Sequence, residues 1–506
     1  MLAYNLPLNH LVISLTDFKN YANILQFVSV QIVQFCLIAS FIYLCSSISI
    51  FFAKSISVFL IITNSIAVYF MLNYGIVIDT GMIDNILNTN KREAFELWHP
   101  SILLYIFLLG ILPSFIIMWV KVSAPARIMR FCMGVLFIVG LSIWLFSTPA
   151  ATLWIGKNDT RLGSRILPWS YIVNITRYLD YRYLEKRTQI KLPDAIFLNN
   201  FRGKQVVVLV IGESARAANM SIYGYQRETN KFTSELDLSV FPIGQACGTR
   251  TKDGTACILT HLGRNANWRT VYEPLPNYLT RHDIYTIIYR NNDGTPPIYG
   301  NEKVDTKALT QSCDGKTCLG TVLDSDLIEG IGSKISNIDH NRIFALVHLR
   351  GSHGPLYYKQ YAPKFEKFKP VCQTSKVAEC SYESLVNAYD NSLLFTDYVL
   401  SDLIQQLKEL KDTQSMVMYV SDHGESLGEN GFYFHSAPLY AAPPEQTNIP
   451  FWIWMSEEFK EVRDITSKTI IKENSYPHDF PFHSILGAFD MRSEIYNKRF
   501  DVFSKD

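Results

Sequence analysis

Residues 415–431 read SMVMYVSDHGESLGENG, and this stretch decides the fold. The apolar run 416–420 predicts a buried strand, and the glycines that follow it end regular structure. Asp422 and His423 should therefore lie at the carboxyl end of a strand, where open α/β sheets place their ligand sites. A carboxylate beside an imidazole offers the oxygen and nitrogen ligands that suit a divalent metal, zinc above all.

The same pair has a simpler interpretation, because an Asp and a His in a loop are often structural or exposed to solvent. Further acids and amides follow closely, namely Glu425, Glu429 and Asn430. Together with the glycines, these residues favour a ligand site over a purely structural loop.

Strand-like apolar runs recur through the second half of the chain and alternate with helical patterns. The runs are 205–211, 284–289, 343–349, 416–420 and 449–455, and a long helical pattern covers 383–410. This alternation predicts a mainly parallel sheet covered by helices on both faces. We therefore expect an α/β catalytic domain over residues 205–506.

The first part of the chain is too apolar for a soluble enzyme. Four stretches, about 23–45, 56–73, 101–120 and 128–147, each approach the ~20 residues that cross a bilayer. Buried helices of a large soluble core are the alternative, but four such runs so close together are hard to bury. Residues 1–147 are therefore expected to form a helical transmembrane domain. The net charge of +1 argues against nucleic acid as a partner.

Basic residues in short connections set the expected orientation of these spans. The connections 46–55 and 121–127 carry Lys or Arg and no acid, so the positive-inside rule makes them cytoplasmic. The connection 74–100 and everything after residue 148 then lie outside. Residues 1–21 contain only LVISL as an apolar run, which is too short to cross a membrane.

Two further segments border the expected spans. The segment 78–98 predicts an outer amphipathic helix on which Asn85, Thr89 and Glu93 share a face, although this spacing also fits an ordinary solvated helix. The segment 148–204 is a connector with ten Lys or Arg against four Asp or Glu. Such a composition suits a segment that touches anionic headgroups, and a merely solvated linker fits nearly as well.

Six cysteines outside the spans occur as close pairs. The pairs are Cys247 with Cys257, Cys313 with Cys318, and Cys372 with Cys380. A zinc ribbon would need two CxxC pairs, which this sequence lacks. Three local disulfides in an oxidising compartment fit better, each contributing ~2–3 kcal/mol by closing a short loop.

Three long motifs carry a resemblance to a known family. SDHGESLGENG at 421–431, GESARAANMSIYGYQRET at 212–229 and CGTRT at 247–251 resemble the phosphoethanolamine transferases of Gram-negative envelopes. That family includes the mobile colistin-resistance enzymes, which modify lipid A. The resemblance implies an alkaline-phosphatase-like, sulfatase-like fold for the catalytic domain, an inner-membrane location, and a periplasmic position for that domain. Family members usually have five spans, so either the first span is missing here or the true start lies upstream of Met1.

The resemblance also implies a set of metal ligands. Matched residue by residue, it places Glu213, Thr251, Asp422 and His423 around one tightly bound zinc, with a second zinc joining during turnover. The residues themselves support part of this, because Glu213 ends a strand and a Thr hydroxyl needs a cation to become a good nucleophile. Chemistry alone does not separate Thr251 from Thr249, and only the family favours Thr251.

Other residues are implied to bind the substrate. His353 and His435 would line the phosphate pocket, where they stabilise charge or carry a proton, although a single His in a loop is as often structural. Asn292 matches an amide beside the donor headgroup, in a local spacing that departs from the family pattern. The residues of the membrane domain that would help to hold the lipid donor are Asn85, Thr89 and Glu93, by their match to the family.

The implied reaction is a two-step transfer by a monomer. Thr251 attacks the phosphorus of phosphatidylethanolamine, releases diacylglycerol and keeps phosphoethanolamine, which a phosphate or hydroxyl of lipid A or another lipopolysaccharide acceptor then takes. A glycerol-phosphate transferase or phosphodiesterase on the same fold is the first alternative, and a catalytically inactive membrane sensor or scaffold is the second. A sulfatase would need a Cys or Ser followed by x-Pro-x-Arg, a context that Thr251 lacks.

Overall fold

The protein forms two compact units, Met1–Arg182 and Tyr183–Asp506. The boundary falls within helix α11 (Trp169–Glu185), inside the segment that the sequence suggests as a connector. The computed structural model describes residues 3–16, 21–88, 98–123, 125–185, 189–199, 203–266, 271–305, 322–374, 377–437, 439 and 442–504.

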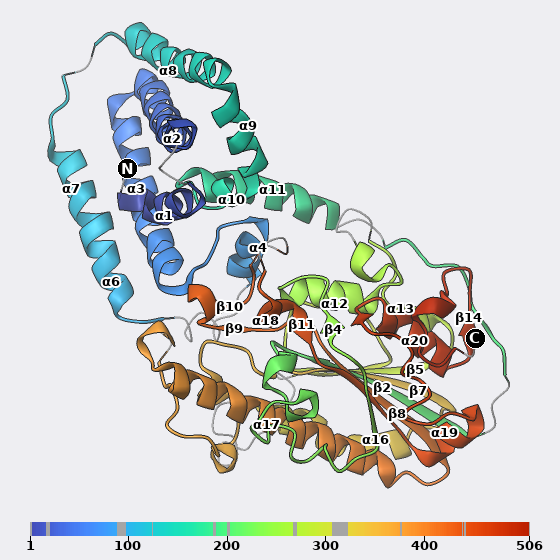
Figure 1. Ribbon diagram of the computed structural model, residues 1–506. Helices are drawn as coiled ribbons and strands as arrows, with labels where there is room; N and C mark the ends of the chain where they lie inside the picture. Colours follow the sequence, from blue (N-terminus) through green and yellow to red (C-terminus); the bar gives the residue numbers. More distant parts are fainter. Residues whose placement is uncertain are drawn as a thin grey trace. The chain divides into compact units, whose positions relative to one another are not determined.

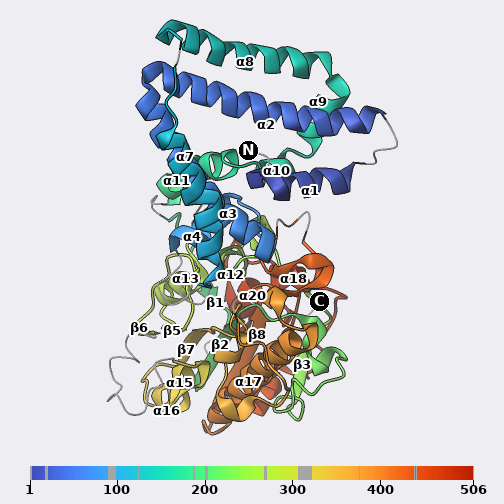
Figure 2. The same cartoon turned by 90° about the vertical axis from the view of Figure 1, so that its left-hand side faces the viewer.

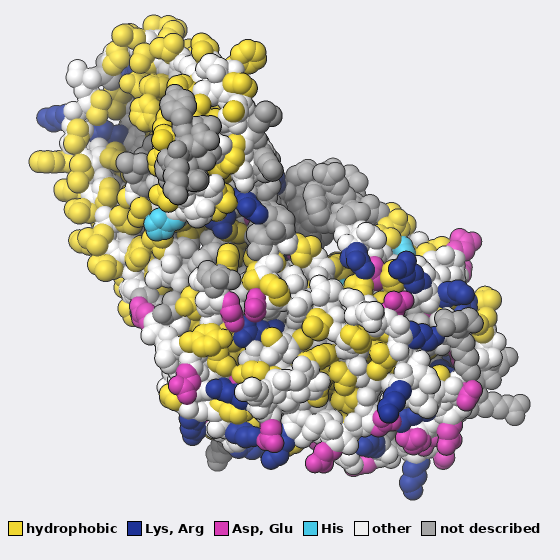
Figure 3. Space-filling model, viewed as in Figure 1, with side chains coloured by type: hydrophobic (Ala, Val, Ile, Leu, Met, Phe, Trp, Pro, Cys, Tyr) yellow, Lys and Arg dark blue, Asp and Glu magenta, His cyan; other side chains and the backbone are white. Residues whose placement is uncertain are grey.

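Four helical segments of the first unit are long and apolar enough to cross a membrane, which confirms the expected number of spans in the described part of the chain. They are α2 (Tyr21–Ile48), α3 (Ile50–Tyr74), the continuous run α6 (Ser101–Tyr105), η2 (Ile106–Ile111) and α7 (Leu112–Trp119), and α8 (Arg127–Ser147). Large apolar side chains remain exposed along them, such as Phe59 and Phe146, as a bilayer requires (Figure 3). The second unit instead shows charges of both signs on its surface.

The second span differs from its expected bounds. It begins at Ile50 rather than near residue 56, because the hydroxyl of Ser49 caps the helix by accepting a hydrogen bond from the amide of Phe52. Lys54 therefore lies in the first turns of α3 and not in a loop. Its ammonium donates to the carbonyl oxygen of Val120 at 2.5 Å, just beyond the end of the third span.

Helices α2 and α8 run side by side in both views (Figures 1 and 2). The hydroxyl of Ser40 donates to the carbonyl oxygen of Gly134 at 2.8 Å, and the indole of Trp144 donates to Ser29 at 3.1 Å. Small residues and interhelical hydrogen bonds of this kind hold membrane helices together.

A short helix that sequence analysis missed, α1 (Leu6–Leu15), precedes the first span. Asn5, just before it, exchanges two hydrogen bonds with the backbone of Leu167, at 2.9 and 3.2 Å. Leu8 of α1 packs in a buried cluster with Leu162, which lies in α10 (Asp159–Gly163). The start of the chain is therefore packed against residues that follow the fourth span. Helix α9 (Pro149–Lys157) connects α8 to α10.

The second unit is built on a seven-stranded sheet with the order β3-β12-β8-β2-β7-β5-β6. Its strands are β2 (Lys204–Gly212), β3 (Leu238–Val240), β5 (Tyr285–Arg290), β6 (Glu302–Asp305), β7 (Arg342–His348), β8 (Thr413–Ser421) and β12 (Phe451–Met455). The five strands from β8 to β6 are parallel, whereas β12 runs antiparallel to both β8 and β3. The predicted mainly parallel sheet is confirmed.

Helices cover both faces of this sheet (Figure 1). On one face, α12 (Thr251–Leu259), α13 (Leu275–Arg281) and α20 (Phe480–Ala488) bury apolar side chains against alternate residues of β2, β7 and β8. On the other face lies α17 (Tyr382–Lys408), the helix expected from the pattern over 383–410. Because both faces are covered, β8 is buried along its whole length and its loops at the carboxyl edge are held in place.

Candidate active site

Two neighbouring strands bring the acidic residues together. In the parallel pairing of β2 and β8, Gly212 lies opposite Ser421, so Glu213 and Asp422 begin adjacent loops at the carboxyl edge of the sheet. Nε2 of His423 is 3.3 Å from Oε1 of Glu213 and 3.4 Å from Oδ2 of Asp422. All three side chains are fully buried.

The two buried acids of this cluster favour the binding of a cation. Burial, and then the neighbouring Glu213, raise the pKa of Asp422 well above its usual value. Burial alone would also raise the pKa of Glu213, but the positive charge of His423 holds it below the usual range. Burial opposes the His423 cation, yet the two carboxylates raise its pKa to about 10. The positive charge of His423 therefore keeps Glu213 ionised, whereas Asp422 would need a further cation to stay ionised.

The donor set fits a divalent metal. Oδ2 of Asp422 is buried, and none of the described residues donates a hydrogen bond to it. Nδ1 of His423 donates to the carbonyl oxygen of Gly424 at 2.8 Å, which leaves Nε2 toward the carboxylates, as in metal-ligating histidines. Ligand atoms of Glu213, His423 and His435 also lie within 4.8 Å of one another. Oxygen and nitrogen ligands in such a group could hold zinc.

Thr251 faces the cluster from the first position of helix α12. Its hydroxyl donates to Oε2 of Glu213 at 3.1 Å and lies 3.4 Å from Nε2 of His423. The helix approaches closely because residue 254 is Gly, where a Cβ would lie 2.3 Å from the carbonyl oxygen of Asp422. A helix N-terminus also favours an anion such as phosphate beside Thr251.

Thr249, which chemistry alone could not distinguish from Thr251, points elsewhere. Its side chain is buried, and its hydroxyl donates to the carbonyl oxygen of Ala437 at 2.5 Å. Its own carbonyl oxygen accepts a hydrogen bond from the amide of Ser436 at 2.8 Å. Thr249 therefore fixes the loop that leads to α12, while the hydroxyl of Thr251 contacts the cluster.

The remaining candidates of the second unit also converge here. The ring of His435 lies 4.3 Å from that of His423, and the ring of His353 lies 6.0 Å from that of His435. The amide of Asn292 donates to Oε2 of Glu213 at 2.6 Å, so this residue orients a carboxylate of the cluster. The sequence suggested Asn292 only as a loose match to a headgroup contact.

Three of the predicted substrate-binding residues belong to the first unit. Asn85 lies in α4 (Thr80–Asn88), whereas Thr89 and Glu93 lie outside the described residues. The role of these three residues in holding a lipid remains a prediction.

Two of the three disulfides expected from the sequence are formed. Cys247 is bonded to Cys257, and Cys372 to Cys380. Cys313 and Cys318 lie outside the described residues. The first disulfide joins the loop before α12 to the second turn of that helix, so Thr251 lies inside the closed loop.

Removing the first disulfide should impair both stability and activity. We expect the double variant Cys247→Ser, Cys257→Ser to lose about 2–3 kcal/mol of stability, because an open loop gains conformational entropy on unfolding. Activity should fall as well, since the start of α12 loses its covalent anchor. Thermal unfolding and initial rates measure the two effects.

A matched control is the double variant Cys372→Ser, Cys380→Ser. This pair closes a loop of similar length before α17, so a similar loss of stability is expected with activity retained. Equal losses of activity in both double variants would show that the first disulfide has no special effect on Thr251.

Comparisons with known proteins identify the family. The family described as phosphoethanolamine transferase EptA/EptB matches residues 35–183, and the sulfatase family matches residues 205–491. The phosphoethanolamine transferase EptA of Helicobacter pylori is 32% identical, over 92% of this chain and 88% of that protein. EptA of Escherichia coli K12 is 31% identical, over 95% of this chain and 90% of that protein. The chain belongs to the phosphoethanolamine transferase family.

A solved structure agrees over the whole length. The integral membrane protein lipooligosaccharide phosphoethanolamine transferase A from Neisseria meningitidis has a TM-score of 0.88 and 26% sequence identity. The match covers 98% of this chain and 95% of that one. This transferase therefore combines a membrane unit with an alkaline-phosphatase-like, sulfatase-like catalytic unit, as the resemblance implied.

Sequence analysis missed some of the residues that shape the transferase site. Arg216 is buried, and its guanidinium donates to the carboxylate of Glu429 at 2.6 Å and to the carbonyl oxygen of Glu425 at 3.1 Å. It thereby joins the two motifs that follow β2 and β8. A buried Arg that neutralises an acid of another motif could have been suspected from GESARA, but its partner is visible only in the fold.

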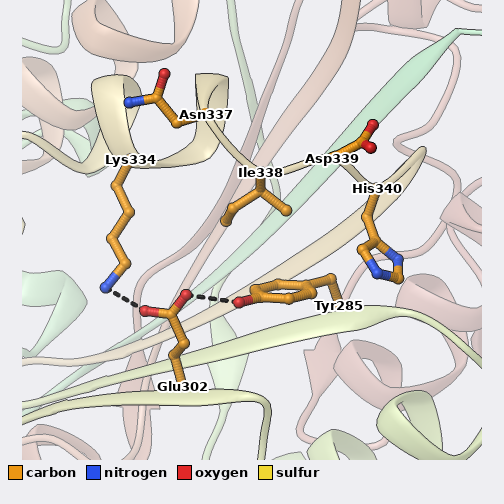
Figure 4. A pocket seen from close by; sticks show the side chains of 7 residues that line it. All are labelled: Tyr285, Glu302, Lys334, Asn337, Ile338, Asp339 and His340. Atoms are coloured by element: carbon orange, nitrogen blue, oxygen red, sulfur yellow. Dashed lines mark hydrogen bonds and ion pairs between the residues drawn. The ribbon is translucent and has the colours of Figure 1, made fainter.

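A hollow of about 430 Å³ lies at the other edge of the transferase sheet (Figure 4). Tyr285 and Glu302, the first residues of β5 and β6, line it together with Lys334 and His340. Glu302 accepts a hydrogen bond from Tyr285 at 2.6 Å and pairs with Lys334 at 2.5 Å, so its charge is already compensated. The catalytic candidates follow the carboxyl ends of the strands and do not line this hollow.

Proposed function

We propose that this transferase moves phosphoethanolamine from phosphatidylethanolamine to lipid A, or to another lipopolysaccharide acceptor, through a phosphoester on Thr251. The observation that carries this proposal is the position of the Thr251 hydroxyl. It lies 3.1 Å from Glu213 and 3.4 Å from His423 at a helix N-terminus, while the hydroxyl of Thr249 is bonded elsewhere.

The first step forms a bond from Oγ1 of Thr251 to phosphorus and breaks the bond from phosphorus to the glycerol oxygen. The hydroxyl proton passes to a neutral imidazole of the site, because the pKa of Glu213 is held below its usual range and this carboxylate would be a zinc ligand. Diacylglycerol leaves with a proton, for which His353 and His435 are the nearby imidazole sources. In the second step an acceptor oxygen attacks phosphorus, and the bond to Thr251 breaks.

A zinc ion would be held by Glu213, Asp422, His423 and Thr251. When bound, it supplies the positive charge that makes a Thr hydroxyl a competent nucleophile at neutral pH. Asn292 keeps the carboxylate of Glu213 in place through its 2.6 Å hydrogen bond. The N–H groups at the start of α12 face developing negative charge on the phosphoryl oxygens.

The names of the relatives support the choice of substrates. Proteins similar to this chain include the phosphatidylethanolamine transferase Mcr-1, at 29% identity over 87% of this chain, and a Kdo(2)-lipid A phosphoethanolamine 7''-transferase, at 24% identity over 78%. A donor and an acceptor that are both lipids also explain why a catalytic unit is joined to membrane spans.

Mass spectrometry of lipopolysaccharide tests the proposal. Gram-negative cells that produce the protein should carry phosphoethanolamine on lipid A or on the inner sugars, and cells without it should not. Fragmentation of the modified lipid identifies the acceptor. Unchanged lipopolysaccharide, together with release of glycerol phosphate from other lipids, would instead support the glycerol-phosphate alternative.

We further propose that the catalytic unit lies in the periplasm and that the spans cross the inner membrane. The bond from Lys54 to Val120 supports a common side for the end of the third span and the start of the second. The bonds between Asn5 and Leu167 support a common side for the first residues and the chain after the fourth span.

Cysteine labelling should reveal this topology. Ser14 is exposed near the end of α1, and Ser123 is exposed between α7 and α8. A membrane-impermeant maleimide should label Ser14→Cys in cells with a permeable outer membrane, and Ser123→Cys only after the inner membrane is broken. The unaltered chain serves as the blank for its own cysteines. Protection of Ser14→Cys until lysis would contradict the proposed placement of the first residues.

A further inference from the structure

We propose that Tyr357 is a positioning residue for transfer, and that it acts through Glu425 on the ring of His435. The inference rests on the proposed function, because it concerns the same site. Within the described part of the chain, Tyr357 makes no hydrogen bond to the residues that would hold zinc or form the phosphoester.

The two oxygens of one buried carboxylate connect Tyr357 to His435. The hydroxyl of Tyr357 donates to Oε1 of Glu425 at 2.5 Å, and Oε2 of Glu425 is 2.8 Å from Nδ1 of His435. The Glu425 side chain is fully buried, and Tyr357 is 1% exposed. Both oxygens are thus held, and a buried carboxylate that lost one partner would have to turn or admit water.

The hydrogen bonds from Tyr357 through Glu425 orient the ring of His435. This ring lies beside the cluster of Glu213 and His423. With Nδ1 engaged by Glu425, the ring of His435 lies 4.3 Å from that of His423 and 6.0 Å from that of His353. A ring nitrogen of His435 also lies within 4.8 Å of ligand atoms of Glu213 and His423. The angle of the His435 ring therefore decides where its free nitrogen meets a phosphoryl oxygen or a leaving group.

Tyr357 is itself fixed by its surroundings. Its ring meets that of Tyr389 edge to face, with centroids 5.4 Å apart, and the hydroxyl of Tyr389 donates to the carbonyl oxygen of Ser214 at 2.7 Å. Residue 354 is Gly, where a Cβ would lie 2.7 Å from the Tyr357 hydroxyl and 3.0 Å from Oε1 of Glu425. The hydroxyl is therefore confined beside this carboxylate.

The consequence is a mechanical link between two loops of the site. Tyr357 belongs to the segment after β7, which also carries His353, and Glu425 belongs to the segment after β8, which also carries His423. A single hydroxyl therefore keeps groups from both loops in register. Preorganised groups lower the barrier only if they stay in place, and a displacement of about 1 Å can cost roughly 100-fold in rate.

The substitution Tyr357→Phe removes this hydroxyl and little else. With the full-length protein loaded with zinc, we expect kcat for transfer from phosphatidylethanolamine to fall by about 10–100-fold. KM for the donor should stay within about twofold, because Tyr357 is 1% exposed and offers the lipid almost no surface, and the zinc content should be unchanged. This separation of kcat from KM is not expected from a general loss of stability.

Tyr496→Phe is the matched control. The hydroxyl of Tyr496 donates to the buried carboxylate of Asp501 at 2.5 Å, a contact of the same kind away from the site. It should lose similar stability and keep the kcat of the unaltered protein. If Tyr357→Phe kept its kcat within twofold, or if both variants lost kcat equally, the inference would be overturned.

A second measurement does not depend on transfer. Diethyl pyrocarbonate modifies accessible imidazoles, and the half-buried ring of His435 should react several times faster in Tyr357→Phe than in the unaltered chain, because it is no longer held. Peptide mapping gives the rate for His435 alone. If the unaltered protein transferred nothing, the proposed function would fall, and equal modification rates would separately overturn the role of Tyr357.

Discussion

Thr251→Ala should abolish transfer, with a loss of at least about 10⁴-fold in kcat, while zinc stays bound. The loss is expected because the hydroxyl that would form the phosphoester is removed. Zinc should remain because Glu213, Asp422 and His423 still offer three ligands from a buried cluster. Metal analysis and transfer assays on the same preparation measure both properties.

Thr249→Ala is the control two residues away. It loses the hydrogen bond to the carbonyl oxygen of Ala437, which is worth about 1 kcal/mol, and it leaves the cluster intact. Intact-protein mass spectrometry after incubation with phosphatidylethanolamine should show a phosphoethanolamine adduct on the unaltered chain and on Thr249→Ala. An adduct that persisted on Thr251→Ala would place the nucleophile elsewhere.

His423→Ala should lose both the metal and the activity, because it removes the imidazole that lies between two buried carboxylates. Without that group, Glu213 and Asp422 would face each other with one ligand fewer, and their repulsion would raise the pKa of at least one of them. Protonation of a carboxylate lowers its affinity for zinc further. We expect the zinc content to fall below about one tenth of that of the unaltered protein, since the loss of a ligand and its orienting bonds costs more than tenfold in affinity.

His340→Ala is the control for His423→Ala, because it removes another histidine of the same unit. His340 lines the hollow at the amino ends of the strands, where its ring lies 5.1 Å from that of Tyr285. Zinc content and transfer should both stay near those of the unaltered protein. Retention of stoichiometric zinc in His423→Ala would argue that the cluster is not the metal site.

Sequence patterns predicted the elements whose signal is local. The runs 205–211 and 416–420 correspond to the buried strands β2 and β8, because a strand covered on both faces must be apolar throughout. The four spans were predicted for a similar reason, because a helix that crosses a bilayer must be apolar over about 20 residues. The short strands β3 and β6 were not predicted, since three or four residues at the sheet edges carry no distinctive pattern.

Features that depend on distant contacts could not be found in this way. Helix α1 was missed because its apolar run is too short to span a membrane, and the packing that stabilises it comes from residues such as Leu162. Thr249 and Thr251 have the same chemistry, and only their contacts with Ala437 and Glu213 separate them. The partner of Tyr357 lies 68 residues further along the chain.

The contact between Asn5 and Leu167 has a consequence for biosynthesis. The two residues are separated by 162 positions, so the ribosome must add the entire membrane region between them before they can meet. At 5–20 residues per second, this takes roughly 8–30 s. During that interval the first helix can pack only on spans already made, such as α2, whose Gln31 donates a hydrogen bond to Asn9 at 2.9 Å, and the nascent bundle stays open at this end. Closure of the membrane unit is therefore a late event, which must follow insertion of the fourth span.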